Sequence, residues 1–313
     1  MPIVRVFSGS VASDTKIDLL ASLASSGSVL GMDCRVVSEQ RYTPCDVAVI
    51  WGQSKTARRF GGTDLAEHVF RSEVISRHAG PVVIIDAPLM GRKVQAHRRR
   101  PWLFRKLVPR RAAWAQRLFP FWHSMNEVFG EYRVGLGGAL GDNGGLALAP
   151  FAQGRYQLLA RRLQLPPLQP YRRNGQNVIV MGQVPGDAAL RGLDIDEWIV
   201  NTSTRLRQLT DRPVRVRLHP GAGTPDPKLI AALQVIGVAV EEPSRSFANS
   251  CQDAWAVVTY CSGAAIDALM AGVPAIATSS ASFAWDVTDH DLACVVSPTE
   301  FPREEWLERL AAA

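Results

Sequence analysis

No apolar run in the sequence approaches the roughly 20 residues that a helix needs to span a bilayer. The first ten residues, MPIVRVFSGS, lead directly into a strand-like stretch and lack the charged and apolar regions of a signal peptide. We therefore expect a cytoplasmic protein.

Cysteine patterns that hold metal ions are also missing. The five cysteines are scattered, and neither a CxxC nor a Cys/His pair has the spacing of a zinc site (Cys34, Cys45, Cys251, Cys261 and Cys294). We expect reduced, mostly buried thiols, no metal and no resident cofactor.

Acidic residues are absent from one long stretch, residues 87–126. Ten basic side chains fall within it: Arg92, Lys93, Arg98, Arg99, Arg100, Arg105, Lys106, Arg110, Arg111 and Arg117. This segment accounts for the formal net charge of +6, since the rest of the chain is close to neutral. Such a segment attracts a polyanion, which can be nucleic acid, an anionic membrane surface or an acidic glycan. A solvated basic helix is the plainer alternative.

With 313 residues, 47% of them hydrophobic, the chain has material for two cores. We predict an N-terminal domain over residues 1–165 with a basic insertion at 92–122. A proline-rich linker follows at 166–175, and a C-terminal domain takes residues 176–313.

Short apolar runs alternate with helix-compatible stretches in both halves. In the first half we expect strands at residues 3–8, 34–37, 46–51 and 81–85 and a helix at 14–25. In the second half we expect strands at 177–181, 214–218, 238–241, 256–260 and 275–278, with helices at 194–209, 228–235 and 264–270. Apolar strands separated by helices predict an α/β fold with parallel sheets covered on both faces.

Glycine makes up six of the eleven residues from Gly135 to Gly145, so we expect no regular element there. The segment is either an acceptor-site loop or a flexible connection.

The strongest chemical signal is AVVTYCSGAAIDALMAGVP, which begins at Ala256. A buried strand ends, Ser262 and Gly263 turn the chain, and a helix begins whose free N–H groups suit a phosphate. Asp267, one helical turn along, is placed to accept hydrogen bonds from ribose hydroxyls. An ordinary strand-to-helix turn with small residues is the alternative.

A second signal lies at His219-Pro220, where the preceding strand ends. Ligands of open parallel sheets bind beyond the carboxyl ends of the strands, and an imidazole there can donate to a phosphate oxygen. Arg217 suits the same role, and Gln183 lies where the first strand of this domain ends, so it is a candidate contact to sugar or phosphate.

Together, His219-Pro220, Ser262-Gly263, Asp267 and Gly272-Val273-Pro274 resemble the donor-side motifs of GT-B glycosyltransferases. The resemblance is greatest to capsule-polysaccharide synthases and bacterial sialyltransferase-like enzymes, and it covers about Asn177 to Asp291. It implies two Rossmann-like domains that face a central cleft, a nucleotide-sugar held by the C-terminal domain, and transfer without a metal.

The N-terminal half matches this family only through Trp51-Gly52, Asp86 and the RVGLG stretch that begins at Arg133. Glycosyl transfer to a hydroxyl needs a base, and an aspartate after a strand suits that role. Asp86 is the first candidate and Asp142, in the glycine-rich stretch, is the second. Asp86 is followed by Ala87-Pro88, which departs from the acidic-glycine pattern of the family.

The loop that begins at Gly182 and the stretch Phe283–Asp286 also resemble phage-encoded proteins, some of which glycosylate hydroxymethylated pyrimidines in DNA. Aromatic residues interleaved with the basic ones could stack on an unpaired base or form the buried face of a helix (Trp102, Phe104, Trp114, Phe119, Phe121 and Trp122). Our first hypothesis is therefore transfer from a UDP-sugar, such as UDP-glucose, to 5-hydroxymethyl pyrimidine in duplex DNA, in the host cytoplasm.

Three alternatives stay open. The first is a surface-polysaccharide glycosyltransferase at the inner membrane face, where a basic amphipathic helix could bind. The second is a nucleotide- or DNA-binding protein without catalysis. The third is a UDP-sugar epimerase, which needs no macromolecular acceptor. The sequence does not distinguish uridine from cytidine donors.

Overall fold

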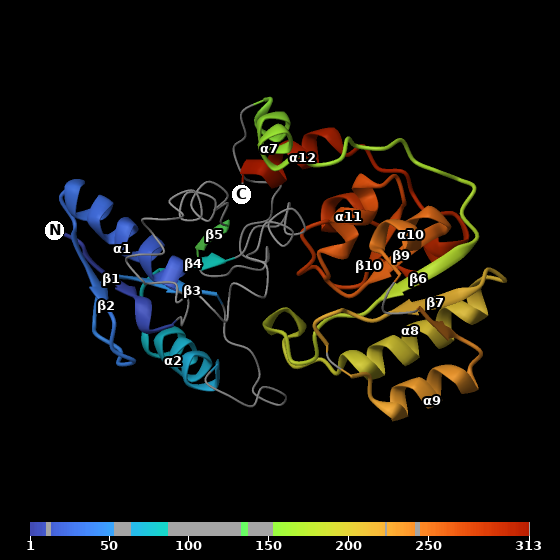
Figure 1. The fold of residues 1–313 in the computed structure, drawn as a ribbon, viewed down its shortest axis with the longest axis horizontal. Helices are drawn as coiled ribbons and strands as arrows, with labels where there is room; N and C mark the ends of the chain where they lie inside the picture. Colours follow the sequence, from blue (N-terminus) through green and yellow to red (C-terminus); the bar gives the residue numbers. More distant parts are fainter. Residues whose placement is uncertain are drawn as a thin grey trace, which may run out of the picture. The chain divides into compact units, whose positions relative to one another are not determined.

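The computed structural model of the chain describes residues 1–10, 14–52, 64–86, 133–136, 153–222, 224–241 and 245–312. By their contacts the residues form two compact units (Figure 1). The first comprises Met1–Gly52, Glu73–Ala139 and Gln157–Leu165, and the second comprises Gln53–Ser72, Leu140–Tyr156 and Pro166–Ala313.

The first unit is built on a five-stranded sheet with the order β2-β1-β3-β4-β5. Its strands are β1 (Ile3–Phe7), β2 (Asp33–Val37), β3 (Val47–Trp51), β4 (Val82–Asp86) and β5 (Arg133–Leu136). The first four are parallel, and β5 is antiparallel to β4. This is the flavodoxin-like order 2-1-3-4-5, whose strand order reverses between β1 and β3.

Alternating apolar residues hold helix α1 (Asp14–Val29) against the first sheet. Val4 and Val6 of β1 share a buried cluster with Val49 of β3 and with Leu20 and Ala24 of α1. The 3-10 turn η1 (Ser8–Ser10) follows β1, and helix α2 (Asp64–Arg77) connects β3 to β4. Helix α7 (Arg155–Leu163) follows β5.

The second unit is built on a wholly parallel sheet with the order β10-β9-β6-β7-β8. Its strands are β6 (Asn177–Met181), β7 (Val214–Arg217), β8 (Ala239–Val240), β9 (Ala254–Thr259) and β10 (Ala275–Ala277). Counted within the unit this is the Rossmann order 3-2-1-4-5, and the order reverses between β6 and β9.

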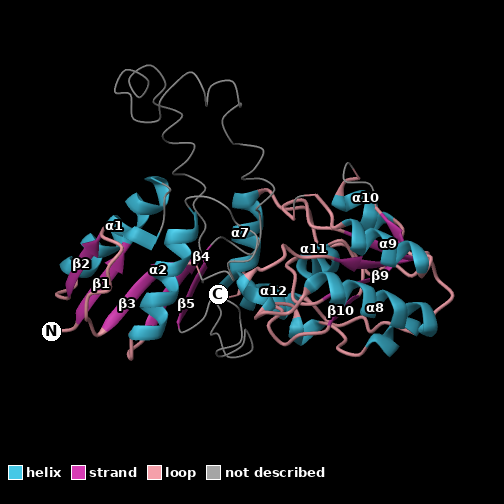
Figure 2. Ribbon diagram, turned by 90° about the horizontal axis from the view of Figure 1, so that it is seen from below, coloured by secondary structure: helices cyan, strands magenta, loops and turns pink. Residues whose placement is uncertain are grey.

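Helices cover both faces of this sheet (Figures 1 and 2). Helices α8 (Ile195–Leu209) and α9 (Pro227–Val235) pack on one face, and α10 (Phe247–Gln252) and α11 (Ala264–Met270) pack on the other. Every residue of β6 is buried, as expected for a central strand that has helices on both sides. The connections η3 (Ala188–Leu190), η4 (Trp285–Val287) and η5 (Leu292–Val296) and helix α12 (Glu304–Ala312) complete the unit.

The predicted fold class is confirmed: the chain is α/β, with two Rossmann-like units of largely parallel strands. The central cleft between them stays a prediction. Asp194 is the N-cap of α8, and its carboxylate accepts hydrogen bonds from the backbone N–H groups of Asp196 and Glu197.

Two expectations about irregular segments need correction. Gly135 and Leu136, expected to lie outside regular structure, belong to β5, where Gly135 is level with Ile84 of β4. An edge strand tolerates glycine here because β4 supplies the pairing partner. The rest of that glycine-rich stretch lies outside the described residues.

The segment predicted as a linker packs against the second unit. Arg172 donates hydrogen bonds to the carbonyls of Cys251 and Ala271, and its own N–H donates to Gly272. The guanidinium of Arg303 lies 3.8 Å from the ring centre of Tyr171 and donates to the carbonyl of Gln169. These contacts fix residues 169–172 to the end of α11. In the described part of the chain, no helix is long and apolar enough to cross a membrane.

Candidate functional site

The candidate donor residues lie at the carboxyl ends of three adjacent strands in the second unit. Met181, the last residue of β6, is level with Arg217 of β7 and with Thr259 of β9. Neighbouring strands lie roughly 4.8 Å apart, so the ends of β7 and β9 are separated by about 10 Å. The structure thus brings the loops that carry Gln183, His219 and Ser262 to one edge.

At the end of β9, the turn leads directly into α11, as predicted. The hydroxyl oxygen of Ser262 accepts a hydrogen bond from the N–H of Ala264 at 3.2 Å. Gly263 and Asp267 are exposed, whereas Ala265 and Ile266 are buried against the sheet. The exposed side of this turn therefore carries Gly263 and Asp267 together.

Neither the backbone conformation at position 263 nor the packing of the described residues around it requires a glycine. Its φ of −58° and ψ of −11° are ordinary right-handed values that any residue adopts. No described atom lies within 4 Å of the place where a Cβ would stand. By contrast, Gly272, at the other end of α11, has a φ of +76°, and a Cβ there would meet the carbonyl oxygen of Pro170. Close approach of a ligand would explain the glycine at position 263.

His219 stands in an exposed turn after β7. Its carbonyl accepts from the N–H of Ala222 at 2.9 Å, and its Nδ1 accepts from the N–H of Gly221, also at 2.9 Å. Because Nδ1 is the acceptor, the neutral ring carries its proton on Nε2. His219 is therefore arranged as a donor at the sheet edge, which is the chemistry that a phosphate oxygen needs.

Gln183 is turned toward the neighbouring loop and is only 8% exposed. Its Oε1 accepts from the backbone N–H of Cys261 at 3.1 Å, and its amide lies 3.5 Å from the Cys261 sulfur. The Cys261 thiol also donates to the carbonyl of Ala189 at 3.4 Å. Burial raises the pKa of this thiol to about 11, although the hydrogen bond from Gln183 acts in the opposite direction.

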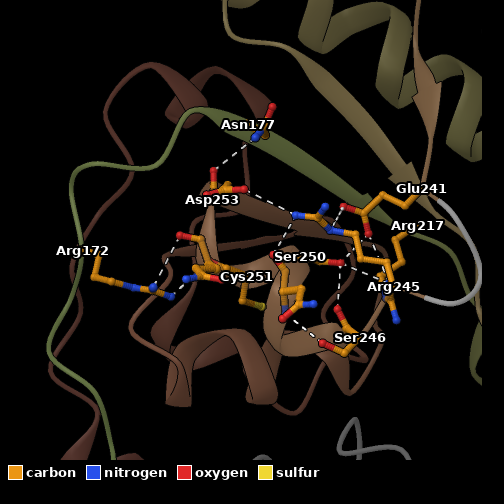
Figure 3. Close-up of polar contacts among 11 residues, drawn as sticks. Arg172, Asn177, Arg217, Glu241, Arg245, Ser246, Ser250, Cys251 and Asp253 are labelled. Carbon is orange, nitrogen blue, oxygen red and sulfur yellow. Dashed lines mark hydrogen bonds and ion pairs between the residues drawn. The ribbon is translucent and has the colours of Figure 1, made fainter.

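Arg217 points under the sheet edge into a charged cluster (Figure 3). Its guanidinium lies 3.2 Å from a carboxylate oxygen of Glu241 and 3.1 Å from the hydroxyl of Ser250. The Ser250 hydroxyl also donates to Glu241, and the Nε of Arg245 lies 3.6 Å from Oε1 of Glu241. Contact between Arg217 and a donor would have to compete with this ion pair.

Sequence reasoning named Arg217 but missed its partners Glu241 and Ser250 and the neighbouring Arg245. Glu241 follows β8 directly, its side chain is only 2% exposed, and its Oε1 makes no hydrogen bond within the described residues. A buried carboxylate oxygen without a hydrogen bond has unused accepting capacity. The only signal in the sequence was a glutamate after a short apolar run, and this pattern is too common to predict a functional site.

The remaining candidates belong to the first half of the chain. Asp86 ends β4, and its backbone is level with Arg133 of β5. Asp142 and the nine basic candidates between Arg92 and Arg111 lie outside the described residues. Among the residues that the structure describes, no group of three or more His, Cys, Asp or Glu side chains could hold a metal ion. Metal independence stays a prediction.

No protein-family model matches the sequence, and no curated protein does. Among solved structures, the chain is similar to Thermosulfurimonas dismutans KpsC, titled as a beta Kdo 2,4 transferase. The identity is 15% and the TM-score 0.44, over 100% of this chain and 90% of that one.

A second KpsC structure from the same organism, titled as a beta Kdo 2,7 transferase, matches with 13% identity and a TM-score of 0.43, over 100% and 90% of the two chains. The UDP-GlcNAc 2-epimerase of Methanocaldococcus jannaschii, in complex with UDP-GlcNAc and UDP, matches with 11% identity and a TM-score of 0.29, over 96% and 81%.

With these identities and with TM-scores below 0.5, the similarities carry no conclusion about activity. None of the three titles names a DNA-modifying enzyme. The two sheets themselves define the class, which is a chain of two Rossmann-like units with a GT-B-like plan. In the second unit, exposed polar groups stand at the edge where such folds bind nucleotides.

Proposed function

We propose that this protein is a glycosyltransferase that takes its sugar from a nucleotide-sugar bound at the carboxyl edge of the second sheet. The observation that carries the proposal is the exposed pair of loops ending β7 and β9. One presents His219 with its proton on Nε2, and the other presents Gly263 with space above it.

In the proposed reaction, a base takes the proton from an acceptor hydroxyl. The hydroxyl oxygen then forms a bond to the anomeric carbon of the sugar, and the bond from that carbon to the nucleotide phosphate breaks. Negative charge develops on the departing phosphate, so donors fixed beside it lower the barrier. His219 and the turn Ser262-Gly263 supply these donors, and Asp267 binds the ribose.

The base that we propose is Asp86, with Asp142 as the second candidate. Gln183 and Arg217 were predicted as direct donor contacts, and both side chains are engaged within the second unit. Glu241 joins the candidates because it follows β8 and because its Oε1, 3.6 Å from the Nε of Arg245, makes no hydrogen bond within the described residues. The donor is a UDP-sugar, with a cytidine nucleotide as the alternative.

For the acceptor, we place a surface polysaccharide before DNA. The basic segment suits an acidic glycan as well as it suits DNA. The donor motifs His219-Pro220 and Ser262-Gly263 resemble those of capsule-polysaccharide synthases more closely than those of phage proteins. Hydroxymethyl pyrimidine in duplex DNA is the second candidate, supported by the basic segment with its interleaved aromatic residues and by the resemblance of two short stretches to phage-encoded proteins.

The test is a nucleotide-release assay with a panel of UDP- and CMP-sugars. Each donor is offered with a capsule-type oligosaccharide, with duplex DNA containing 5-hydroxymethyluracil or 5-hydroxymethylcytosine, with unmodified DNA, and with no acceptor. We expect release that requires the oligosaccharide. Release that requires the hydroxymethyl group would establish the DNA acceptor, and interconversion of the sugar without an acceptor would establish an epimerase.

A pair of histidine variants connects the activity to the site. His219→Ala should lower kcat/KM by about 10- to 100-fold, because it removes a hydrogen bond to a charged group. His290→Ala is the matched control, since His290 is exposed in the same unit and its described contacts, a hydrogen bond to a carbonyl and a ring stack, are both with Trp285. Equal activity of both variants would remove His219 from the site.

A further inference from the structure

Between β6 and β9 the backbone ladder stops before the loops begin. The β6–β9 pairing ends at Met181 and Thr259. Beyond it, β6 continues toward β7 through the N–H of Gly182, which donates to Arg217, and β9 continues toward β10 through the N–H of Ser279, which donates to Tyr260. The loops after β6 and β9 thus separate toward opposite faces of the sheet, as expected where strand order reverses.

The side chain of Gln183 spans this opening. Its Oε1 receives the N–H of Cys261, two residues beyond the end of β9, at 3.1 Å. The thiol of Cys261 returns a hydrogen bond to Ala189, in the loop after β6. Gln183, Ala189 and Cys261 are each 8% exposed or less, and Ala281 packs against the last two. Because these residues are buried, loss of the hydrogen bond between the Cys261 N–H and Gln183 is costly, whereas the contacts of the thiol are weak.

This contact lies directly beside the proposed donor turn. Cys261 precedes Ser262 and Gly263, and its N–H is held by a side chain from the loop after β6. Both ends of the Gln183 amide face Cys261: its Oε1 accepts that N–H, and its Nε2 lies 3.5 Å from the Cys261 sulfur. With the side chain only 8% exposed, contact with a donor would require the amide to leave this arrangement and would leave the buried N–H unpaired, which is unfavourable.

We propose that Gln183 is a positioning residue: with Cys261 it forms a latch that fixes the turn Ser262-Gly263 for the donor, without touching the donor itself. The inference deepens the proposed function, and it separates Gln183 from His219, which faces outward. The latch is defined by Gln183, Cys261 and the carbonyl of Ala189.

The first test needs no substrate. Gln183→Met has a similar length but cannot accept the Cys261 N–H, so the turn should open more often. Alkylation of Cys261 by iodoacetamide, followed by mass spectrometry of its peptide, should become roughly tenfold faster, because a buried thiol with a pKa of about 11 reacts only when it is exposed. Cys251, 1% exposed in the core of the same unit, reports global unfolding and should keep its rate.

The second test uses the donor that the release assay identifies. In Gln183→Met the KM for the donor should rise roughly tenfold with kcat within about twofold, because the latch prepares the binding turn. Gln183→Glu should keep the donor KM of the wild type at low pH, because its neutral carboxyl still accepts the Cys261 N–H. A buried ionised carboxylate is unfavourable, so as the pH rises and the group ionises, its side chain should turn toward solvent. The Cys261 N–H then loses its acceptor, and the KM for the donor should climb. Gln208→Met, at an exposed position on α8, is the matched control.

The outcomes separate the two proposals. Faster Cys261 labelling without transfer from any donor would support the latch and reject the glycosyltransferase. A raised donor KM with unchanged Cys261 labelling would overturn the latch and make Gln183 a direct contact. If the labelling of Cys251 also rises in Gln183→Met, that variant unfolds globally and Gln183→Glu becomes the test. In Gln183→Glu, the labelling rate of Cys261, but not of Cys251, should increase with pH more steeply than in the wild type. The same pH dependence in both proteins would overturn the latch.

Discussion

The turns that follow the strands differ in exposure between the two sheets. In the first sheet, the turn after β1 is packed against the residues that follow β2, whereas in the second sheet the turns after β7 and β9 are exposed. Ser8, at the end of β1, is 4% exposed and donates to the carbonyl of Val37. A Cβ on Gly9 would lie 2.8 Å from the carbonyl oxygen of Ser38, whereas a Cβ on Gly263 would meet no described atom within 4 Å. The first glycine is required by packing and the second is not.

This difference in exposure distinguishes two units that have similar folds. Both units are doubly wound, but the first has the order 2-1-3-4-5 with an antiparallel edge strand, and the second has the all-parallel Rossmann order. Only at the second edge does the structure show a strand that leads through an exposed glycine into a helix within the described residues. This contrast is the reason why we propose the donor site in the second unit and the base in the first.

The largest expected effect lies in the first unit. Asp86→Asn should lower kcat by roughly 10²- to 10⁴-fold, because it removes the proposed general base, while donor affinity stays unchanged. Steady-state kinetics and equilibrium donor binding measure the two quantities separately. Asp18→Asn, exposed on α1, is the control. If Asp142→Asn carries the loss and Asp86→Asn does not, Asp142 is the base.

The next effect concerns the stability of the second unit. Leu206 is fully buried between α8 and the sheet, so Leu206→Ala should lower the free energy of unfolding by about 2–5 kcal/mol. Val235→Ala, at a side chain that is 87% exposed, should change it by less than about 0.5 kcal/mol. Urea denaturation checks both values, and an equal loss in the two variants would contradict the assigned core.

The two glycines sharpen the comparison directly. Gly9→Ala should destabilise by about 1–3 kcal/mol, because backbone carbonyls leave no room for a methyl group. Gly263→Ala should cost less than about 1 kcal/mol, as at an N-cap position, but should weaken donor binding. Thermal unfolding measures the first effect. A stable Gly9→Ala variant would show that the end of β1 can open.

The smallest expected effects on stability come from ion pairs, and each unit contains a comparable pair. The hydrogen bond from Arg5 lowers the pKa of Asp33, and that from Arg173 lowers the pKa of Glu300. A lowered pKa means that each carboxylate contributes stability above its unfolded pKa and loses it as the pH falls through the folded value. Asp33→Asn and Glu300→Gln should therefore lower the Tm slightly at pH 7. The difference from the wild type should shrink as the pH falls below the ordinary carboxyl range and should vanish once both carboxyls are protonated in the folded protein. A difference independent of pH would contradict this origin.

The second sheet was predictable from its strands because each is a continuous apolar run between helical stretches. The expected strands at 177–181 and 214–218 correspond to β6 and β7, and the expected helix at 194–209 to α8. Short α10 was missed, since the six residues FANSCQ show no helical periodicity. Strand β5 was missed because glycine masks its pattern, and only pairing with β4 makes it a strand.

The site was predictable to the extent that it depends on strand ends. His219 and Ser262-Gly263 follow apolar runs, so their common edge could be predicted before the sheet order was known. The engagement of Gln183 with Cys261 could not, because it joins residues 78 positions apart through a sheet order that no local pattern encodes. The same holds for Arg217 and Glu241, whose strands become neighbours only in the folded sheet.

The most direct measurement is calorimetric titration of UDP and CMP, separately, into the wild type, Gly263→Ala and Val235→Ala. We predict that one nucleotide binds the wild type and Val235→Ala equally, and that Gly263→Ala binds it roughly tenfold more weakly while its Tm stays within a few degrees. Equal affinity in all three proteins, or no binding of either nucleotide, would contradict a donor site at the carboxyl edge of the second sheet.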